Sequence, residues 1–472
     1  MLRFYRSLLC TFCVIGCCEV LGFINVYPKL TQLPVPQDSG EPLFLSPLIE
    51  DGKIDEARKL ATVNTLNCSE KVTSYSGYIT VNKEFNANLF FWFFPAKYDY
   101  EKAPVVLWLQ GGPGATSLFG LFTENGPFFI SKKLYLKSRK YSWSNTHSVL
   151  YIDNPVGTGY SFTDDDRGYS RNETSVGENL YSCLLQFFKM FPEIQRNEFF
   201  VTGESYAGKY VPAISYTIHE KNPKAKMHIN LKGFAIGNGL SDPEHMLKYS
   251  SYLYQHGLID SHVRDIFSTK ESEAVKLIQN KQYDKAFGIF DELLNGDLLP
   301  YKTLFYNATG FTFYFNYLHD HDESQFGDLG KYIQQSSVRK AIHVGNKPFN
   351  DGKKVEMNLQ NDIMQSVKPW VEALLDSGMY RAVIYSGQLD IIVPYPATVS
   401  FLQSLKWSGA EKYANATRNI WHVGGSLAGY VKVAGPLTEV LIRNAGHMAP
   451  TDQPKWALDL INRFTANKPF CK

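Results

Sequence analysis

Short, continuous runs of apolar residues recur along this sequence and restrict its fold more than any other feature. Four of them are PVVLWLQ (104–110), HSVLYIDN (147–154), EFFVTGES (198–205) and LKGFAIGNG (231–239). Strands that are buried on both faces of a parallel sheet have this composition. Helical patterns at 177–190 and 210–220 lie between the runs, and strands that alternate with helices predict a mainly parallel α/β sheet.

Further strand patterns flank these runs. YSGYITVN (75–82) and NLFFWFF (88–94) are separated by a polar turn, which predicts an antiparallel hairpin. Residues 23–70, with clusters of proline and glycine, are expected to be irregular. The α/β pattern resumes with MYRAVIYSGQLD (379–390) and LTEVLIRNAGHM (437–448).

The alternation of strands and helices stops near residue 245. Between 251 and 335, apolar residues recur at helical spacing, as in AVKLIQNKQYDKAFGIFDELL. We therefore expect a helical insertion at 251–335 in a domain that is formed by residues 23–250 and 336–472.

The N-terminus has the layout of a secretory signal peptide. Arg3 and Arg6 precede an apolar run from Leu8 to Cys18, and a cleavage site follows at Gly22. The run is short for a membrane span, although a retained anchor is the alternative reading. We expect residues 1–22 to be removed and the mature chain to enter the secretory pathway without a membrane anchor.

Three cysteines remain after residue 22, namely Cys68, Cys183 and Cys471. An odd number allows at most one internal disulfide. Cys183 lies in a helical apolar pattern and is expected to be a buried thiol, which leaves Cys68–Cys471 as the candidate pair. In a secreted chain, N-x-Ser/Thr triplets are candidate glycosylation sites, and they occur here at Asn67, Asn172, Asn307 and Asn415.

The formal net charge is +2, and the sequence has no basic block. A nucleic-acid surface or a polybasic membrane anchor needs clustered lysine and arginine. We therefore expect no nucleic-acid partner and no membrane partner. The sequence does not indicate an oligomeric state.

Ser205 lies between a predicted strand and a predicted helix in VTGESYAGKY. A turn this tight exposes a serine hydroxyl at the top of the sheet if the residues two positions away are small, as Gly203 and Ala207 are. Ser205 is therefore a candidate nucleophile. Its neighbour Glu204 is unexpected, because a second negative charge opposes an attack that builds up negative charge. A solvated loop residue is the alternative reading of Glu204.

A serine nucleophile needs a base and an acid that orients the base, and in this type of fold the order is serine, acid, histidine. Asp390 follows a late predicted strand, and His447 follows the last one after a glycine-rich turn. We expect His343 to be structural. The histidines of HDH (319–321) are expected in a solvated loop rather than at a metal site, and no metal or cofactor is predicted.

The tetrahedral intermediate needs amide donors. VVLWLQGGPG is a strand that runs into a glycine-rich turn, and the amide of Gly112 is free to point into the site because no side chain blocks it. The amide after the nucleophile, at Tyr206, is the second candidate donor. An ordinary tight turn is the alternative for GGPG.

Six motifs together resemble the serine carboxypeptidases, and within them the vitellogenic-like and venom branch: LWLQGGPG, ENGPF, YIDNPVGTGYSF, TGESYAGKYVP, YSGQLD and NAGHMAP. The resemblance covers nearly all of the mature chain. It implies an α/β-hydrolase fold with the helical insertion over the active site, and release of single residues from peptide C-termini. Ser205, Asp390 and His447 match the triad, and Gly112 and Tyr206 match the oxyanion donors.

The resemblance also implies a pocket for the terminal carboxylate of the substrate, at Gln110, Gly111, Glu124 and Glu204. The family usually has asparagine where Gln110 stands, and Ala115-Thr116 replaces a Cys/Ser-Ser pair. Because two ionised glutamates would repel a carboxylate, we expect them to be partly protonated and the peptidase to favour acidic pH. The expected location is outside the cell or in an acidic, lysosome-like compartment.

Three alternatives remain at this point. A carboxypeptidase-like acyltransferase would share the fold and the triad, and a secreted binding protein would share only the fold. A lipase is the third, but the sequence has no long apolar lid helix.

Overall fold

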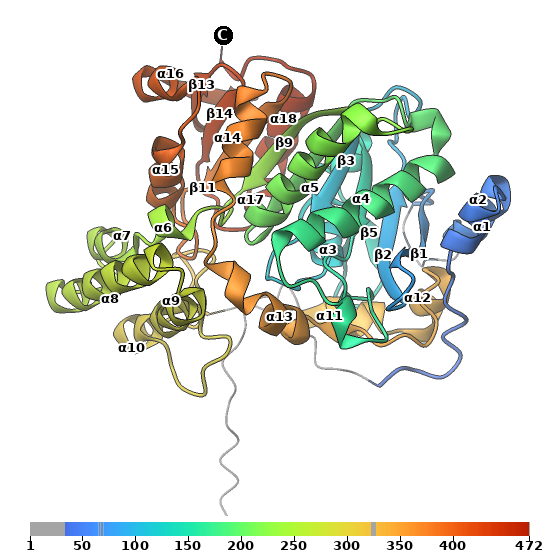
Figure 1. The fold of residues 1–472 in the computed structure, drawn as a ribbon, viewed down its shortest axis with the longest axis horizontal. Helices are drawn as coiled ribbons and strands as arrows, with labels where there is room; N and C mark the ends of the chain where they lie inside the picture. The colour runs from blue at the N-terminus through green and yellow to red at the C-terminus, as the bar shows by residue number, and fades with distance from the viewer. Residues whose placement is uncertain (1–33, 65, 67, 69, 322–326, 472) are drawn as a thin grey trace, which may run out of the picture.

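A ten-stranded sheet forms the centre of the molecule, with strand order β1-β2-β6-β3-β8-β9-β11-β14-β13-β12. The computed structural model describes residues 34–64, 66, 68, 70–321 and 327–471. The strands of the sheet are Tyr75–Asn82 (β1), Ala87–Phe94 (β2), Val105–Leu109 (β3), Ser148–Ile152 (β6), Phe199–Glu204 (β8), Leu231–Gly237 (β9), Arg381–Gly387 (β11), Arg418–Val423 (β12), Ser426–Ala434 (β13) and Leu437–Ile442 (β14). Six neighbouring strands in the middle of this order pair in parallel, namely β6, β3, β8, β9, β11 and β14. The strand pairs at both edges of the sheet are antiparallel (Figure 1).

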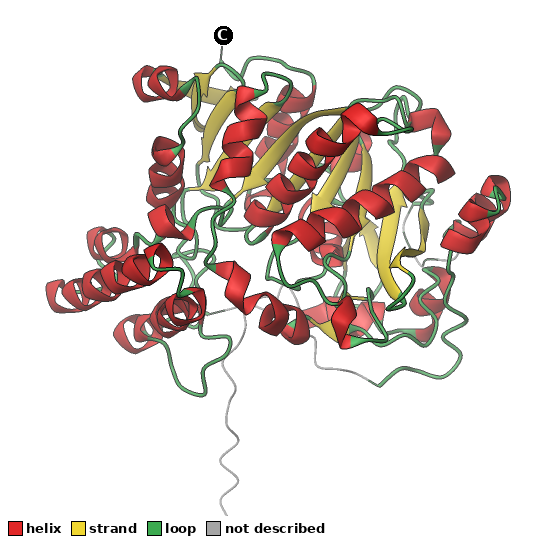
Figure 2. Ribbon diagram, viewed as in Figure 1, coloured by secondary structure: helices red, strands yellow, loops and turns green. Residues whose placement is uncertain are grey.

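Helices cover both faces of this sheet. Phe199 of β8 packs against Phe188 with ring centroids 5.5 Å apart, and Phe200 packs against Phe464 at 5.2 Å. Successive residues of a strand point to opposite faces. The helices that carry these two partners, α4 (Glu173–Met190) and α18 (Pro454–Thr465), therefore lie on opposite sides of β8 (Figure 2). This arrangement confirms the predicted α/β-hydrolase fold class.

The other helices are α1 (Ser46–Glu50), α2 (Ile54–Ala61), α3 (Ser117–Phe119), α5 (Ala207–Lys221), α6 (Pro243–Met246), α7 (Tyr249–Gln255), α8 (Ser261–Gln279), α9 (Tyr283–Phe290), α10 (Leu304–Thr309), α11 (Gly327–Ile333), α12 (Ser336–Ala341), α13 (Lys353–Ile363), α14 (Lys368–Asp376), α15 (Tyr395–Ser404), α16 (Ala410–Asn415) and α17 (Ala449–Asp452). Short strands β4 (Phe128–Ile130) and β5 (Leu136–Ser138) pair with each other, as do β7 (Thr158–Gly159) and β10 (Asn350–Asp351).

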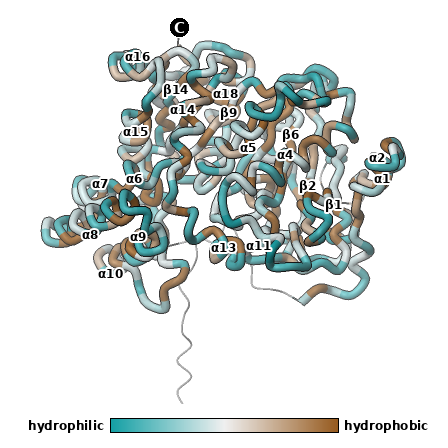
Figure 3. Tube along the Cα trace, in the orientation of Figure 1, coloured by the Kyte–Doolittle hydropathy of each residue, from teal (hydrophilic) through white to brown (hydrophobic). Residues whose placement is uncertain are grey.

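Helices α8 to α10 and most of α7 come from the segment that we predict as an insertion, and they project to one side of the sheet (Figure 1). α8 alternates between hydrophilic and hydrophobic residues along its length, as an amphipathic helix does (Figure 3). Phe267, Ala274 and Ile278 of α8 are buried, so its apolar stripe packs inward. The division of the chain into a main domain and an insertion stays a prediction.

Two parts of the chain differ from expectation. Residues 46–61, expected to be irregular, form α1 and α2. α2 has Asp55 and Glu56 in its first turn and basic residues in its last, which suits the helix dipole. The β12–β13 hairpin was not predicted from the sequence. Its two-residue loop is Gly424-Gly425, with φ of 58° and 84°.

The predicted Cys68–Cys471 disulfide is wrong, because both cysteines are free thiols. The Cys68 thiol instead lies 2.7 Å from the carbonyl oxygen of Glu70. Cys183 is completely buried, as predicted. Among the described residues no helix is long and apolar enough to cross a membrane.

Three of the four predicted glycosylation sites, Asn172, Asn307 and Asn415, are exposed. Asn67 and the predicted signal peptide at 1–22 lie outside the described residues. Glycosylation and signal cleavage stay predictions.

Candidate active site

The candidate site residues follow central strands of the sheet, at the carboxyl ends of those strands. Leu109 at the end of β3 pairs with Gly203 of β8, and Glu204 pairs with Gly237 of β9. Further along, Gly387 of β11 pairs with Ile442 of β14. The segments that follow these strands therefore start at the same edge, and they carry Gln110, Ser205, Asp390 and His447.

Ser205 has a backbone conformation that favours glycine, with φ of +63°. Its amide donates to the carbonyl of Gly237 at 3.0 Å, and its carbonyl accepts from the amide of Leu240 at 3.0 Å. Strained residues of this kind cluster at functional sites, because the surrounding structure has to hold them. A Cβ atom at Gly203 would lie 2.7 Å from the Cβ of Ala207, which explains why both residues are small.

Asp390 and His447 form a buried pair. The Oδ2 atom of Asp390 lies 2.7 Å from Nδ1 of His447, and both side chains are completely buried. A carboxylate can only accept, so Nδ1 carries a proton and the neutral imidazole keeps the lone pair of Nε2. That Nε2 atom is buried and has no hydrogen-bond partner among the described residues. The pair thus has the geometry that a positioned base requires.

Two neighbours of this pair were not predicted. Asn238, after β9, donates from Nδ2 to Oδ2 of Asp390 at 2.7 Å and accepts from the amide of Gly387 at 3.1 Å. The ring of Phe315 stacks on His447 with centroids 4.6 Å apart and planes 8° apart. The amide of His447 also donates to the carbonyl of Phe315 at 2.6 Å. The turn after β9 and a segment from the predicted insertion therefore hold the candidate acid and the candidate base.

The glycine-rich turn lies against the backbone of Ser205, the candidate nucleophile. A Cβ atom at Gly111 would lie 2.5 Å from the amide nitrogen of Tyr206 and 2.7 Å from Cβ of Ser205, so only glycine allows this approach. Gly112 has φ of +109°, which also suits glycine. The amide of Tyr206 precedes α5, where the first amides have no carbonyl partner within the helix. The candidate donors Gly112 and Tyr206 thus come from adjoining segments.

A buried acid fixes the far side of the same turn. Asp153, after β6, accepts from the hydroxyl of Thr116 at 2.5 Å and from the amide of Ser117 at 3.0 Å. Its second oxygen accepts from the amide of Tyr160 at 2.9 Å. Thr116 therefore helps to hold the glycine-rich turn in place through Asp153, at a position where the sequence departs from the family pattern.

The candidate carboxylate pocket is built around Gln110. Its Nε2 donates to Oε1 of Glu204 at 3.1 Å, and its Oε1 accepts from the indole of Trp108 at 2.9 Å. A Cβ atom at Gly120 would lie 2.1 Å from Nε1 of Trp108, so glycine is required there. Gly120 begins the π-helical turn Gly120–Asn125 that carries Glu124. Turns of this kind occur often at functional sites.

Glu124 and Glu204 are completely buried, so the reading of Glu204 as a solvated loop residue is wrong. Burial raises the pKa of Glu124 to about 7. Burial and the neighbouring Glu124 charge raise the pKa of Glu204 well above its ordinary value. Both oxygens of Glu124 and Oε2 of Glu204 lack hydrogen-bond partners among the described residues. The pocket can therefore present protonated carboxyl groups to a ligand.

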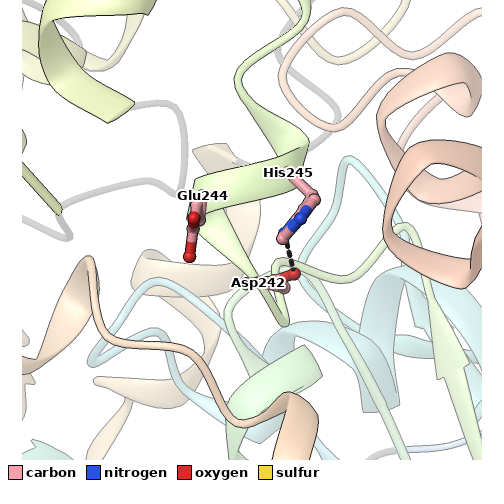
Figure 4. Close-up of side chains that lie close together, drawn as sticks. All are labelled: Asp242, Glu244 and His245. Carbon is pink, nitrogen blue, oxygen red and sulfur yellow. Dashed lines mark hydrogen bonds and ion pairs between the residues drawn. The ribbon is translucent and has the colours of Figure 1, made fainter. Parts of the chain in front are cut away.

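One cluster outside this site, Asp242, Glu244 and His245, has donor atoms close enough to hold a metal ion (Figure 4). Asp242 lies 2.6 Å from Nδ1 of His245, and Glu244 accepts from Gln279 at 3.0 Å. The ammonium group of Lys368 lies 3.9 Å from Asp242. These contacts explain the cluster as an internal polar network. His321 of the HDH segment is exposed and contacts Asp320 at 2.5 Å.

The comparisons with known proteins agree with this geometry. Residues 65–467 match the family model described as serine carboxypeptidase. The chain is 57% identical to a venom serine carboxypeptidase of Apis mellifera, over 95% of this chain and 96% of that protein. It is 47% identical to a vitellogenic carboxypeptidase of Aedes aegypti, over 98% and 99%.

Among solved structures, a prohormone-processing carboxypeptidase from Saccharomyces cerevisiae, Kex1Δp, has the same fold, with a TM-score of 0.74 and 23% identity. The match covers 87% of this chain and 96% of that one. The family match and the extent of the two sequence matches leave no competing assignment: the chain belongs to the serine carboxypeptidase family.

Proposed function

We propose that this serine-type carboxypeptidase releases single residues from the C-termini of peptides and proteins, with Ser205, His447 and Asp390 as its triad. The observation that carries this assignment is the buried Glu204, next to Ser205, with Glu124 close enough to affect its pKa. A nucleophile alone attacks any carbonyl. Two protonated glutamates beside the nucleophile can bind a free C-terminal carboxylate. They therefore favour attack on the last peptide bond of the substrate.

The proposed reaction follows the acyl-enzyme route. His447 takes the proton of the Ser205 hydroxyl as the oxygen attacks the last peptide carbonyl. The oxyanion is stabilised by the amides of Gly112 and Tyr206. The C–N bond then breaks, and His447 passes its proton to the leaving amine. Water attacks the acyl-enzyme in the same way and releases the shortened peptide.

The proposed carboxylate pocket consists of Gln110, Gly111, Glu124 and Glu204. Protonated Glu204 and Glu124 donate hydrogen bonds to the substrate carboxylate, and the amide of Gly111, the residue after Gln110, is the further proposed donor. Gln110 supports this arrangement through its bond to Glu204. The indole of Trp108 fixes the Gln110 side chain, which reaches one carbon further than the usual asparagine.

We expect the activity on peptide acids to fall as pH rises through about 7, the pKa of Glu124. Below that pH Glu124 is protonated and donates, whereas above it the charge repels the substrate carboxylate. A peptide methyl ester has no terminal carboxylate and should lose less. The measurement is kcat/KM from pH 4 to pH 9 for a blocked dipeptide acid and its ester. In a Glu124→Gln variant, which cannot ionise there, the loss above pH 7 should be smaller. Identical pH profiles for acid and ester would rule out this role.

A peptide library that is digested at pH 5 and pH 7 and read by mass spectrometry tests the function itself. Stepwise loss of C-terminal residues supports it. A chain that transfers acyl groups from an ester but leaves blocked dipeptides intact would be an acyltransferase. Failure of a fluorophosphonate to label Ser205 would indicate an inactive binding protein.

The relatives include venom and vitellogenic carboxypeptidases, which is consistent with the secretory pathway. We propose that residues 1–22 are a signal peptide and that the mature protein acts outside the cell or in an acidic, lysosome-like compartment. We also propose that residues 251–335 cover the active site. Two contacts support this: Phe315 stacks on His447, and the Tyr252 hydroxyl donates to the carbonyl of Asp390 at 2.8 Å.

A further inference from the structure

The proposed oxyanion donors belong to two different segments of the chain. One helix contacts both of these segments. Gly112 lies in the turn after β3, and Tyr206 directly precedes α5. The two segments already pack against each other at Gly111, where a Cβ atom would lie 2.5 Å from the amide nitrogen of Tyr206. Beyond that contact they continue to Gly114 and Lys209. Helix α13, Lys353–Ile363, reaches from one to the other.

The first contact is at the N-terminal end of α13. A Cβ atom at Gly114 would lie 2.8 Å from Cα of Gly352, and a Cβ atom at Gly352 would lie 2.3 Å from the carbonyl oxygen of Gly114. The two backbones therefore pack directly, with φ of +89° at Gly114 and +83° at Gly352. The glycine-rich turn rests on the residue that precedes α13.

The second contact is at the C-terminal end of α13. The ammonium group of Lys209 is completely buried and lies 2.8 Å from Oδ2 of Asp362. It also donates to the carbonyls of Asp362 and Ile363. A cation at the C-terminus of a helix is favoured by the helix dipole. Lys209 also lies 5.4 Å from the ring centre of Tyr206, which ties the contact to the residue that carries the second donor.

We propose that α13 is a brace that sets the spacing of the two oxyanion donors, with Lys209 and Asp362 as positioning residues. The inference rests on the proposed function. A helix is rigid along its axis, and the ten-residue step from 352 to 362 spans roughly 15 Å at 1.5 Å per residue. A misplacement of about 1 Å at a catalytic group can cost about 10²-fold in rate. The brace therefore affects turnover more than substrate binding.

Two variants test the brace. Lys209→Met with Asp362→Leu removes both charges together, because removing one partner alone would leave an unpaired buried charge. Asp362→Glu keeps the ion pair but lengthens it by one methylene. We expect kcat to fall about 10–10²-fold in the double variant and less in Asp362→Glu, with KM within twofold of wild type.

A transition-state readout separates positioning from stability. The affinity for a peptidyl boronic acid, which forms a tetrahedral adduct on the serine, should fall in parallel with kcat. The affinity for the product amino acid, bound through its carboxylate, should not change. Asp291→Asn is the matched control, because Asp291 is a buried acid that accepts from Asn295 and the Asp297 amide in the predicted insertion. It should lower Tm without affecting kcat.

The outcomes are distinct. A folded variant, double or Asp362→Glu, that keeps kcat and boronic acid affinity within twofold of wild type overturns the brace. If the double variant does not fold, the kcat and boronic acid affinity of Asp362→Glu decide whether the brace exists. Wild-type protein without peptidase activity would instead overturn the proposed function, so the two failures cannot be confused.

Discussion

Replacing Ser205 with alanine should lower the turnover of a peptide acid by about 10⁴–10⁶-fold. The hydroxyl is the proposed nucleophile, and without it His447 has no proton to take. The residual rate reflects binding and the oxyanion donors acting on water. The measurement is kcat on a blocked dipeptide, with active-site titration to exclude contaminating peptidase.

Ser215→Ala is the matched control for this change. Ser215 lies on α5, the helix that follows Ser205, is completely buried, and its hydroxyl has no hydrogen-bond partner among the described residues. Its loss should leave kcat unchanged. Clean Ser205→Ala protein that keeps activity within tenfold of wild type would exclude Ser205 as the nucleophile.

The second large effect is expected at Asp390. Asp390→Ala removes the acceptor that holds Nδ1 of His447 and the negative charge that stabilises the imidazolium, and should lower kcat by about 10⁴-fold. It also leaves Nδ2 of Asn238 without its carboxylate. KM should change little, because Asp390 lies outside the proposed carboxylate pocket.

Non-additivity gives this prediction a stricter form. If Ser205, His447 and Asp390 act as one unit, the double variant Ser205→Ala/Asp390→Ala should be no slower than Ser205→Ala alone. A double variant that loses a further 10⁴-fold would show that Asp390 acts independently of the serine. Circular dichroism and Tm should confirm that each variant is folded.

The central strands could be predicted because their sequences leave little choice. Strand β8, for example, is buried at every position, so its apolar run is continuous and short. The β12–β13 hairpin is different, because β12 lies at the edge of the sheet and exposes His422 between buried Trp421 and Val423. An exposed edge strand carries polar residues and has a weaker pattern. The Gly424-Gly425 pair was the signal that could have located it.

The site also contains residues that could be predicted from the sequence and residues that could not. Ser205, Asp390 and His447 each follow a recognisable strand, so their order along the chain suggested one edge. Asn238 and Phe315 are not marked by any local pattern, because their roles depend on which segments the fold brings together. The burial of Glu204 was likewise not predictable from its neighbours, because β3, β9 and the Gly120–Asn125 turn all contribute to it.

The order of the strands also determines when the site comes into existence during synthesis. The pair Asn238–Asp390 spans 152 positions in the sequence, and Asp390–His447 spans 57. Contacts at such separations form late, since the intervening chain has to be closed into loops first. His447 follows β14, which comes last in chain order among the described strands of the sheet. A ribosome-bound chain that has not yet been extended past β14 therefore lacks the proposed base, and the proposed site cannot act before that segment is made.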